Sequence, residues 1–287
     1  MNLPIIAALL TGPVFTADKP AAPAAAPVPH PVITEVLFNV PTGDSGDATS
    51  DGVRDANGDE FVELFNPHPT AINLKGYRIS NRLAAGDPSG KKGFSFVFPD
   101  LLLQPGSVVV VFNGLNSTIP APAGTSATAP AGGNDRFHGA AVFAAYSGKG
   151  RPIGFKNEGD CVVLQAPGGK PVEVVTWGTP DPPPPADPLR SEAVKARPKG
   201  SVQRLTAESA FEDHSSLNGS PFSPGMLPKR GEPTPAPAKA QTPTETPGTE
   251  NKPAGSTPSG TSTPPPPNPG PATNKNGGGR KKPGNTP

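Results

Sequence analysis

Asp55-Ala56-Asn57-Gly58-Asp59-Glu60-Phe61-Val62-Glu63-Leu64-Phe65-Asn66-Pro67 is the stretch that decides the fold of this chain. It begins as an acidic turn that contains one glycine. The turn leads directly into a short apolar segment, which stops at an Asn-Pro pair. Four to eight apolar residues bounded by turn-forming residues are typical of a β-strand.

The same pattern recurs along the chain and predicts an all-β fold, a β-sandwich or barrel. No stretch shows a helical period with caps at both ends, and the Ala-rich segment 140–146 is expected to form at most one turn of helix. Ala166-Pro167-Gly168-Gly169 predicts a hairpin turn between two of the strands. The expected strands are Val32–Asn39, Glu60–Asn66, Tyr77–Ser80, Phe94–Phe98, Val108–Phe112, Cys161–Gln165, Val172–Trp177 and Ser201–Leu205.

Composition limits this fold to one domain. The 287 residues include 44 Pro and 34 Gly, and only 33% are hydrophobic, which is too little for two ordinary cores. We expect a β-sandwich over residues 32–228, a Pro/Ala-rich spacer over 18–31 and a disordered Pro/Thr/Gly-rich tail over 229–287. The long loop 113–139 is interpreted as a tolerated insertion in the domain.

The N-terminus predicts export. Residues 3–15 form an apolar run that is too short for a membrane span of about 20 residues, so residues 1–17 are interpreted as a signal peptide. No Lys or Arg precedes the run. The expected location is therefore outside the cell or in the cell envelope, with no membrane span.

Charge argues against a nucleic-acid partner. With 25 basic and 24 acidic residues the net charge is +1, whereas affinity for nucleic acid rests mainly on clustered Lys and Arg. The single cysteine, Cys161, lies in an apolar run and is expected to be a small buried hydrophobe. Trp177 is likewise expected in the core.

The acidic turn is the only candidate metal site. Asp55, Asn57 and Asp59 match the first three ligand positions of a Ca²⁺ loop, in which alternate side chains converge on the ion. The match to an EF-hand then fails, because Glu60 stands where Gly is needed and Asn66 where a bidentate Glu is needed. The alternatives are a different Ca²⁺ loop and an acidic turn that caps its own backbone N–H groups. No other cofactor is expected.

No catalytic constellation is found in the sequence. Nucleophile, phosphate-loop and dinucleotide motifs are absent, and the four histidines are scattered without metal-ligand spacing. His30 and His68 lie beside prolines and are expected in exposed loops. Glu35 and Glu63 lie within strands, where each is expected to face solvent or to accept hydrogen bonds from a loop rather than to form an active site. The prediction is that the protein is not an enzyme.

Nine stretches carry a resemblance when they are taken in order: 32–37, 58–67, 72–80, 94–96, 103–106, 108–112, Asn157-Glu158-Gly159-Asp160 with 161–164, 200–204 and 223–225. Together they resemble the motifs of a lamin tail domain over about residues 31–228. The resemblance implies an immunoglobulin-like β-sandwich. In bacteria, domains of this kind look like export-associated or cell-surface modules, and they are often appended to secreted enzymes. In animals the similar domain belongs to nuclear intermediate filaments. The family implies no catalytic residues.

Three functional hypotheses follow. The first is a non-enzymatic, secreted or cell-envelope module that binds a protein or a surface component. The second is an adhesion module stabilised by Ca²⁺ at the acidic turn. The third is an accessory module of a hydrolase system, or an enzyme with its site in the long loops. Neither a coiled-coil rod nor a catalytic domain is predicted in these 287 residues, so the filament role is not expected to transfer.

Overall fold

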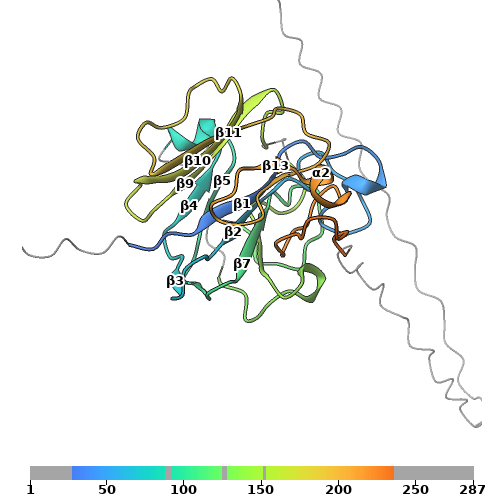
Figure 1. Ribbon diagram of the computed structural model, residues 1–287, viewed down its shortest axis with the longest axis horizontal. Helices are drawn as coiled ribbons and strands as arrows, with labels where there is room; N and C mark the ends of the chain where they lie inside the picture. The colour runs from blue at the N-terminus through green and yellow to red at the C-terminus, as the bar shows by residue number, and fades with distance from the viewer. Residues whose placement is uncertain (1–27, 88–91, 125–127, 151–152, 236–287) are drawn as a thin grey trace, which may run out of the picture. The chain divides into compact units, whose positions relative to one another are not determined.

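Two sheets face one another in this protein (Figure 1). The computed structural model describes residues 28–87, 92–124, 128–150 and 153–235, all within one compact unit. The predicted signal peptide, most of the predicted spacer and residues 236–287 of the predicted tail lie outside the described residues.

The larger sheet has six strands, and β1 lies in its middle although it comes first in the chain. β1 is antiparallel both to β2, the next strand in sequence, and to β12, which comes near the end. In spatial order the strands are β13 (Glu212–Asp213), β12 (Val202–Gln203), β1 (Val32–Leu37), β2 (Phe61–Phe65), β7 (Val108–Phe112) and β8 (Ala141–Ala144).

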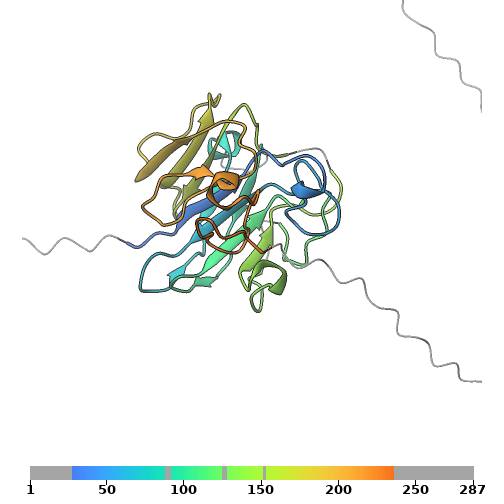
Figure 2. The same ribbon diagram turned by 45° about the vertical axis from the view of Figure 1, so that its right-hand side comes forward.

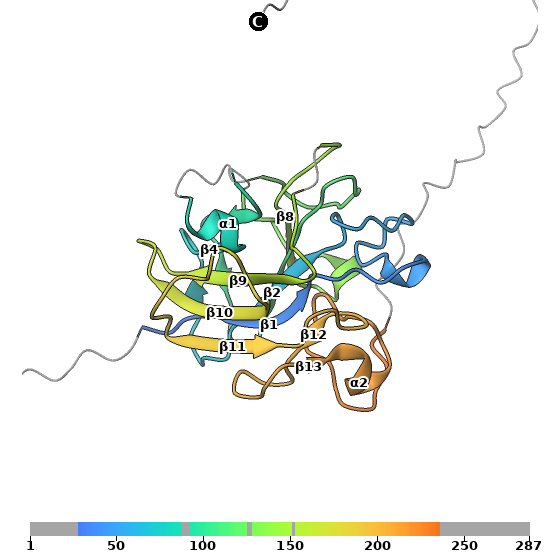
Figure 3. The same ribbon diagram turned by 90° about the horizontal axis from the view of Figure 1, so that it is seen from above.

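The second sheet has five strands, and the predicted hairpin lies within it. β9 and β10 are antiparallel, and Gly169 N donates to Ala166 O over 2.9 Å in the turn between them. Figure 3 shows β11 at the border of this sheet, parallel to β10. In spatial order the strands are β11 (Arg190–Val194), β10 (Pro171–Gly178), β9 (Gly159–Gln165), β4 (Arg78–Ser80) and β5 (Ser95–Val97).

Short elements complete the fold. β3 (Ile72–Asn73) pairs with β6 (Leu102–Leu103) as a separate two-stranded sheet. The helices are α1 (Arg82–Ala85) and α2 (His214–Asn218), together with single 3₁₀ turns at Asp44–Gly46 and Asp135–Phe137. Asn81 begins α1 by accepting a hydrogen bond from Ala84 N, as a helix N-cap does.

The main core lies between the two sheets. Trp177 is buried here as predicted, at 1% exposure, and its ring stacks on Phe38 with 3.9 Å between centroids. Cys161 is also buried as predicted, at 0% exposure, but in a separate small cluster with Val163 and Val174. Alternation along the strands sends every second side chain into this core. Its large members include Ile33, Val62, Leu64, Phe94, Phe96, Phe143, Leu164 and Val175.

The outer face of the six-stranded sheet is also covered. Two segments on this side of the sheet, 140–146 and 113–139, differ from what the sequence predicts. Segment 140–146 forms strand β8 rather than a turn of helix, because it pairs with β7 in parallel. The long loop 113–139 is more than a tolerated insertion, because it brings the fully buried Phe137 onto Phe112 at 5.0 Å between ring centroids. The closing segment, residues 200–235, adds β12 and β13 to this sheet, and its Phe222 joins the outer cluster together with Val40 and Ala48 from the loop after β1 (Figure 2).

The closing segment extends beyond the predicted domain boundary. Residues 229–235 belong to the predicted tail, but Gly231 N donates to Leu217 O over 2.9 Å and Thr234 N donates to Ser220 Oγ over 2.9 Å. The folded domain therefore includes the first residues of the predicted tail.

Candidate functional site

The acidic turn directs its carboxylates at its own backbone. Asp55 Oδ1 accepts hydrogen bonds from Asn57 N and Gly58 N, and Asp59 accepts from Thr49 N and Asp55 N. Burial raises the pKa of Asp59 to about 6. Burial also acts to raise the pKa of Asp55, but the hydrogen bonds from Gly58 and Asn57 hold it below its ordinary value.

These contacts describe a turn that caps backbone N–H groups, as Asx turns do. The backbone amide of Asn57 donates within the turn, and its carbonyl accepts from Glu60 N. In the part of the chain that the structure describes, no three His, Cys, Asp or Glu side chains are grouped as a metal site. The role of Ca²⁺ at Asp55, Asn57 and Asp59 stays a prediction.

Two further acidic side chains of the motifs hold loops in place. Glu60 is buried and accepts hydrogen bonds from Phe155 N at 3.1 Å and Asn113 Nδ2 at 3.1 Å. Asp160 is fully buried and accepts from Arg82 Nη1 at 2.6 Å and from the backbone N–H groups of Arg82, Lys156 and Cys161. Both carboxylates therefore join strands to the loops at the same end of the sandwich.

Glu35 and Glu63 are brought together, because the register of β1 and β2 places them directly opposite. Neither faces solvent, and both accept hydrogen bonds from the closing segment. Ser201 Oγ and Ser223 N donate to Glu35, and Gly225 N donates to Glu63. Burial raises the pKa of both carboxyls, and the neighbouring Glu35 raises that of Glu63 further.

A serine and a histidine complete this buried cluster. Ser223 Oγ lies 2.8 Å from His214 Nε2 and 3.1 Å from Glu35 Oε2. His214 Nδ1 faces the main-chain carbonyl of Ser220 at 2.8 Å, whereas in a catalytic Ser-His-Asp triad that nitrogen faces a carboxylate. His214 and Ser223 are 0% and 1% exposed, so the cluster connects the closing segment to the sheet and presents no open nucleophile.

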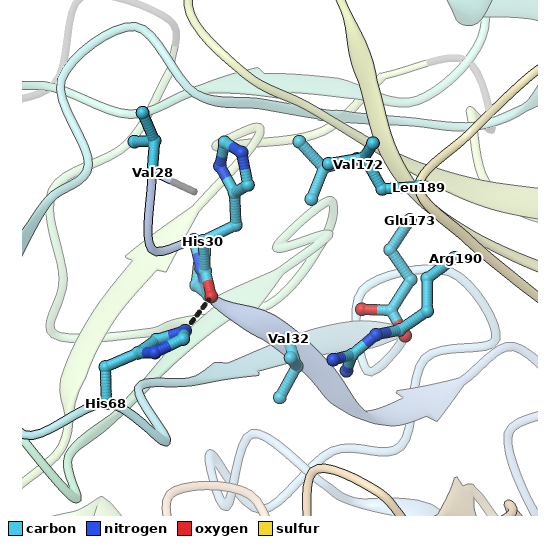
Figure 4. Close-up of a pocket in the computed structure, with 9 residues that line it drawn as sticks. Val28, His30, Val32, His68, Val172, Glu173, Leu189 and Arg190 are labelled. Atoms are coloured by element: carbon cyan, nitrogen blue, oxygen red, sulfur yellow. Dashed lines mark hydrogen bonds between the residues drawn. The ribbon is translucent and has the colours of Figure 1, made fainter. Parts of the chain in front are cut away.

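A pocket lies where β1, β10 and β11 begin (Figure 4). Its volume is about 160 Å³. Its walls come from the residues before β1, the turn after β2, and the first residues of β10 and β11. Val28, Val32, Val172 and Leu189 give it an apolar lining, and His30, His68, Glu173 and Arg190 add polar groups.

Hydrogen bonds fix two walls of this pocket. His68 Nε2 donates to the His30 carbonyl over 3.0 Å, and His30 Nδ1 lies 2.6 Å from the Tyr77 hydroxyl. Glu173 accepts from Ile33 N at 2.8 Å and pairs with Arg204 at 2.8 Å. Burial, followed by the charges of Lys170 and His68, lowers the pKa of His30.

This pocket is not among the sites that the sequence predicts. His30 and His68 are expected in exposed loops, but both are half-buried and in contact. Antiparallel pairing of β1 with β2 is the signal that predicts the contact between His30 and His68. It places the residues before β1 beside the residues after β2.

Comparison with known proteins agrees with this architecture. A model of the lamin tail domain family matches residues 24–179, more than half of the chain. The chain belongs to the lamin tail domain family. Its immunoglobulin-like β-sandwich is the predicted fold. A search of curated proteins finds no match.

The family match ends just after β10. This lamin tail domain protein therefore continues with β11, β12, β13 and α2 beyond the matched region. Both β11 and the closing segment lie in this continuation. No helix among the described residues has the length and apolar character needed to cross a bilayer.

Proposed function

We propose that this lamin tail domain protein is a non-enzymatic binding module of the cell envelope or the extracellular space, which takes up an extended segment of another protein along strand β11. The observation that carries the proposal is the one-sided pairing of β11. Among the described residues its backbone bonds to β10 alone.

The edge that β11 presents is suited to pairing. Proteins usually block an exposed edge with charged side chains, prolines or bulges. Here Arg190 donates to Ala207 O at 3.1 Å, and Glu192 accepts from Phe211 N at 2.7 Å and contacts Arg204 at 3.3 Å. Both charged side chains of β11 are thus bonded within the protein, although Arg190 is exposed together with the small Ser191 and Ala193.

Strand addition is an established way to bind extended peptides. The partner's backbone supplies hydrogen bonds to the edge strand, and alternate side chains supply specificity. The mode needs no catalytic group, in keeping with the buried and internally bonded Ser223 and His214. Export is supported by the apolar run at residues 3–15, which lies outside the described residues.

The test of strand addition is a selection followed by hydrogen exchange. The full chain is immobilised and panned against a displayed library of random ten-residue peptides. Selected peptides should slow amide exchange in β11 and leave β5, the other edge of the same sheet, unchanged. Peptides that protect only other surfaces, or a selection that yields none, would refute the proposal. Cell fractionation that recovers the protein only from the cytosol would refute export.

A further inference from the structure

We propose that the pocket at the start of β11 receives one aliphatic or aromatic side chain of the segment that pairs with β11, next to an acidic residue of that segment. This inference rests on the proposed strand addition and names the chemistry of the partner. The pocket and the strand are continuous, because Leu189 and Arg190 belong to the pocket wall and Arg190 is the first residue of β11.

Exposed apolar surface gathers at this pocket. Val28 and Leu189 are 69% and 59% exposed, and they stand on opposite sides of the opening (Figure 4). Contiguous exposed apolar groups mark binding sites more often than scattered ones do. In the described part of the chain the other exposed large hydrophobics lie away from the pocket lining; they are Val53, Leu83 and Leu102.

The size of the pocket selects one side chain. An apolar cavity of about 150 Å³ holds a benzene ring, and this pocket has about 160 Å³. Leucine, isoleucine, methionine or phenylalanine would therefore fill it, whereas alanine would leave most of it empty. The walls are already held by the bonds of His68 to His30 and of Glu173 to Ile33, so little order has to be gained on binding.

The charges at the rim favour an acidic neighbour for this anchor. Glu173 is neutralised by its ion pair with Arg204, which is buried with it. Lys170 is exposed and forms no ion pair with a described residue, and its charge adds to burial in lowering the pKa of His30, which lines the pocket. A carboxylate beside the anchor would meet this cation. Alternate side chains of a strand share one face, which lets a single segment satisfy both β11 and the pocket.

The experiment uses the peptides selected on the full chain, together with two matched variants. Leu189→Asp places a charge at the pocket, and Leu102→Asp does the same at a residue of similar exposure, 57%, outside it. The selected peptides should share Leu, Ile, Met or Phe at one position. Replacing that residue by Ala, or using Leu189→Asp, should weaken binding about tenfold to a hundredfold. Leu102→Asp should bind as wild type does.

The outcomes separate the two proposals. Peptides that protect β11 but bind Leu189→Asp as well as wild type would refute the anchor pocket and leave strand addition standing. If no peptide protects β11, strand addition itself fails. A synthetic peptide of residues 1–27 serves as competitor. If it displaces the selected peptides from the pocket, the occupant is the chain's own N-terminal segment and the assignment to a partner protein is wrong.

Discussion

Replacing Glu63 by Gln should make the domain more stable at neutral pH. Glu63 lies opposite Glu35 on neighbouring strands, and both are 0% exposed. Its carboxylate accepts from Thr34 Oγ and Gly225 N, each over 2.8 Å. A glutamine of the same shape keeps both bonds, because its amide oxygen can accept from Gly225 N and its nitrogen can donate to Thr34 Oγ.

The sign of the effect follows from the raised pKa of Glu63, caused first by burial and then by the charge of Glu35. The folded protein keeps a proton that the unfolded chain has released. The stability linked to this proton is fully present below the unfolded pKa of about 4.3 and is lost as pH rises through the folded pKa. One group contributes a slope of at most about 1.4 kcal/mol per pH unit.

Between pH 5 and pH 7 the wild type should therefore lose up to about 2.7 kcal/mol through this group, about 5 to 11 °C in melting temperature for a domain of this size. Urea unfolding, followed by the fluorescence of the buried Trp177, measures the change. Asp59, Glu60 and Glu173 also have raised pKa values, but they are common to both proteins.

The decisive quantity is the stability difference between Glu63→Gln and wild type, which should grow with pH. A difference that stays constant from pH 5 to pH 7, or a variant that is less stable than wild type at pH 7, would refute the reasoning. Glu63→Ala is the control, since it leaves the hydroxyl of Thr34 and the amide of Gly225 without an acceptor. Relative to Glu63→Gln it should cost about 2 to 6 kcal/mol at every pH, because neither variant titrates at this position.

Three further predictions concern buried charges and the acidic turn. Arg204→Met should destabilise the domain by about 3 to 5 kcal/mol in thermal unfolding, because it leaves the buried Glu173 without its cation. Asp160→Asn should cost a similar amount, since the side-chain amide nitrogen cannot accept the N–H groups that the carboxylate binds. Millimolar Ca²⁺ should leave the melting curve as it is in EDTA, because backbone amides already occupy oxygens of Asp55 and Asp59.

Each of these has its own check. Arg230→Met removes a partly exposed ion pair with Glu212 and should cost less than about 1 kcal/mol, so an equal loss in Arg204→Met would contradict the argument from burial. Asp160→Asn with wild-type stability would show that the turn does not depend on the charge. A rise in stability with Ca²⁺, about 2.7 kcal/mol at a hundredfold excess over Kd, would establish the acidic turn as a metal site.

Much of the fold could be predicted because most of its strands are short apolar runs bounded by turn-forming residues, a pattern that can be recognised locally in the sequence. All eight expected strands are present, and Ala166–Gly169 forms the expected turn. The expectation of a helical turn at 140–146 is wrong, because an Ala-rich segment carries no strand pattern. β8 forms through its parallel pairing with β7. β11 was missed because Arg190–Val194 is polar and follows a proline-rich loop. It is a strand by virtue of its contact with β10.

The candidate site was far less predictable. Glu35 and Glu63 could be placed on strands, but only the register of β1 and β2 makes them neighbours. Leu189 and Val28 line the same pocket although they are far apart in the sequence, so only the folded structure shows that they are neighbours. Sequence patterns carry the period of an element, whereas register and long-range pairing depend on how the complete core packs.

The central place of β1 has a consequence for biosynthesis. Its neighbour β12 is supplied by the end of the domain, and Ser201 meets Glu35 across 166 positions of sequence. While the ribosome is still translating the residues before β12, one edge of β1 has no partner and can pair with another nascent chain. Contacts this distant in sequence slow folding. A recombinant fragment cut at the family boundary, residue 179, would keep that edge open permanently and is expected to aggregate.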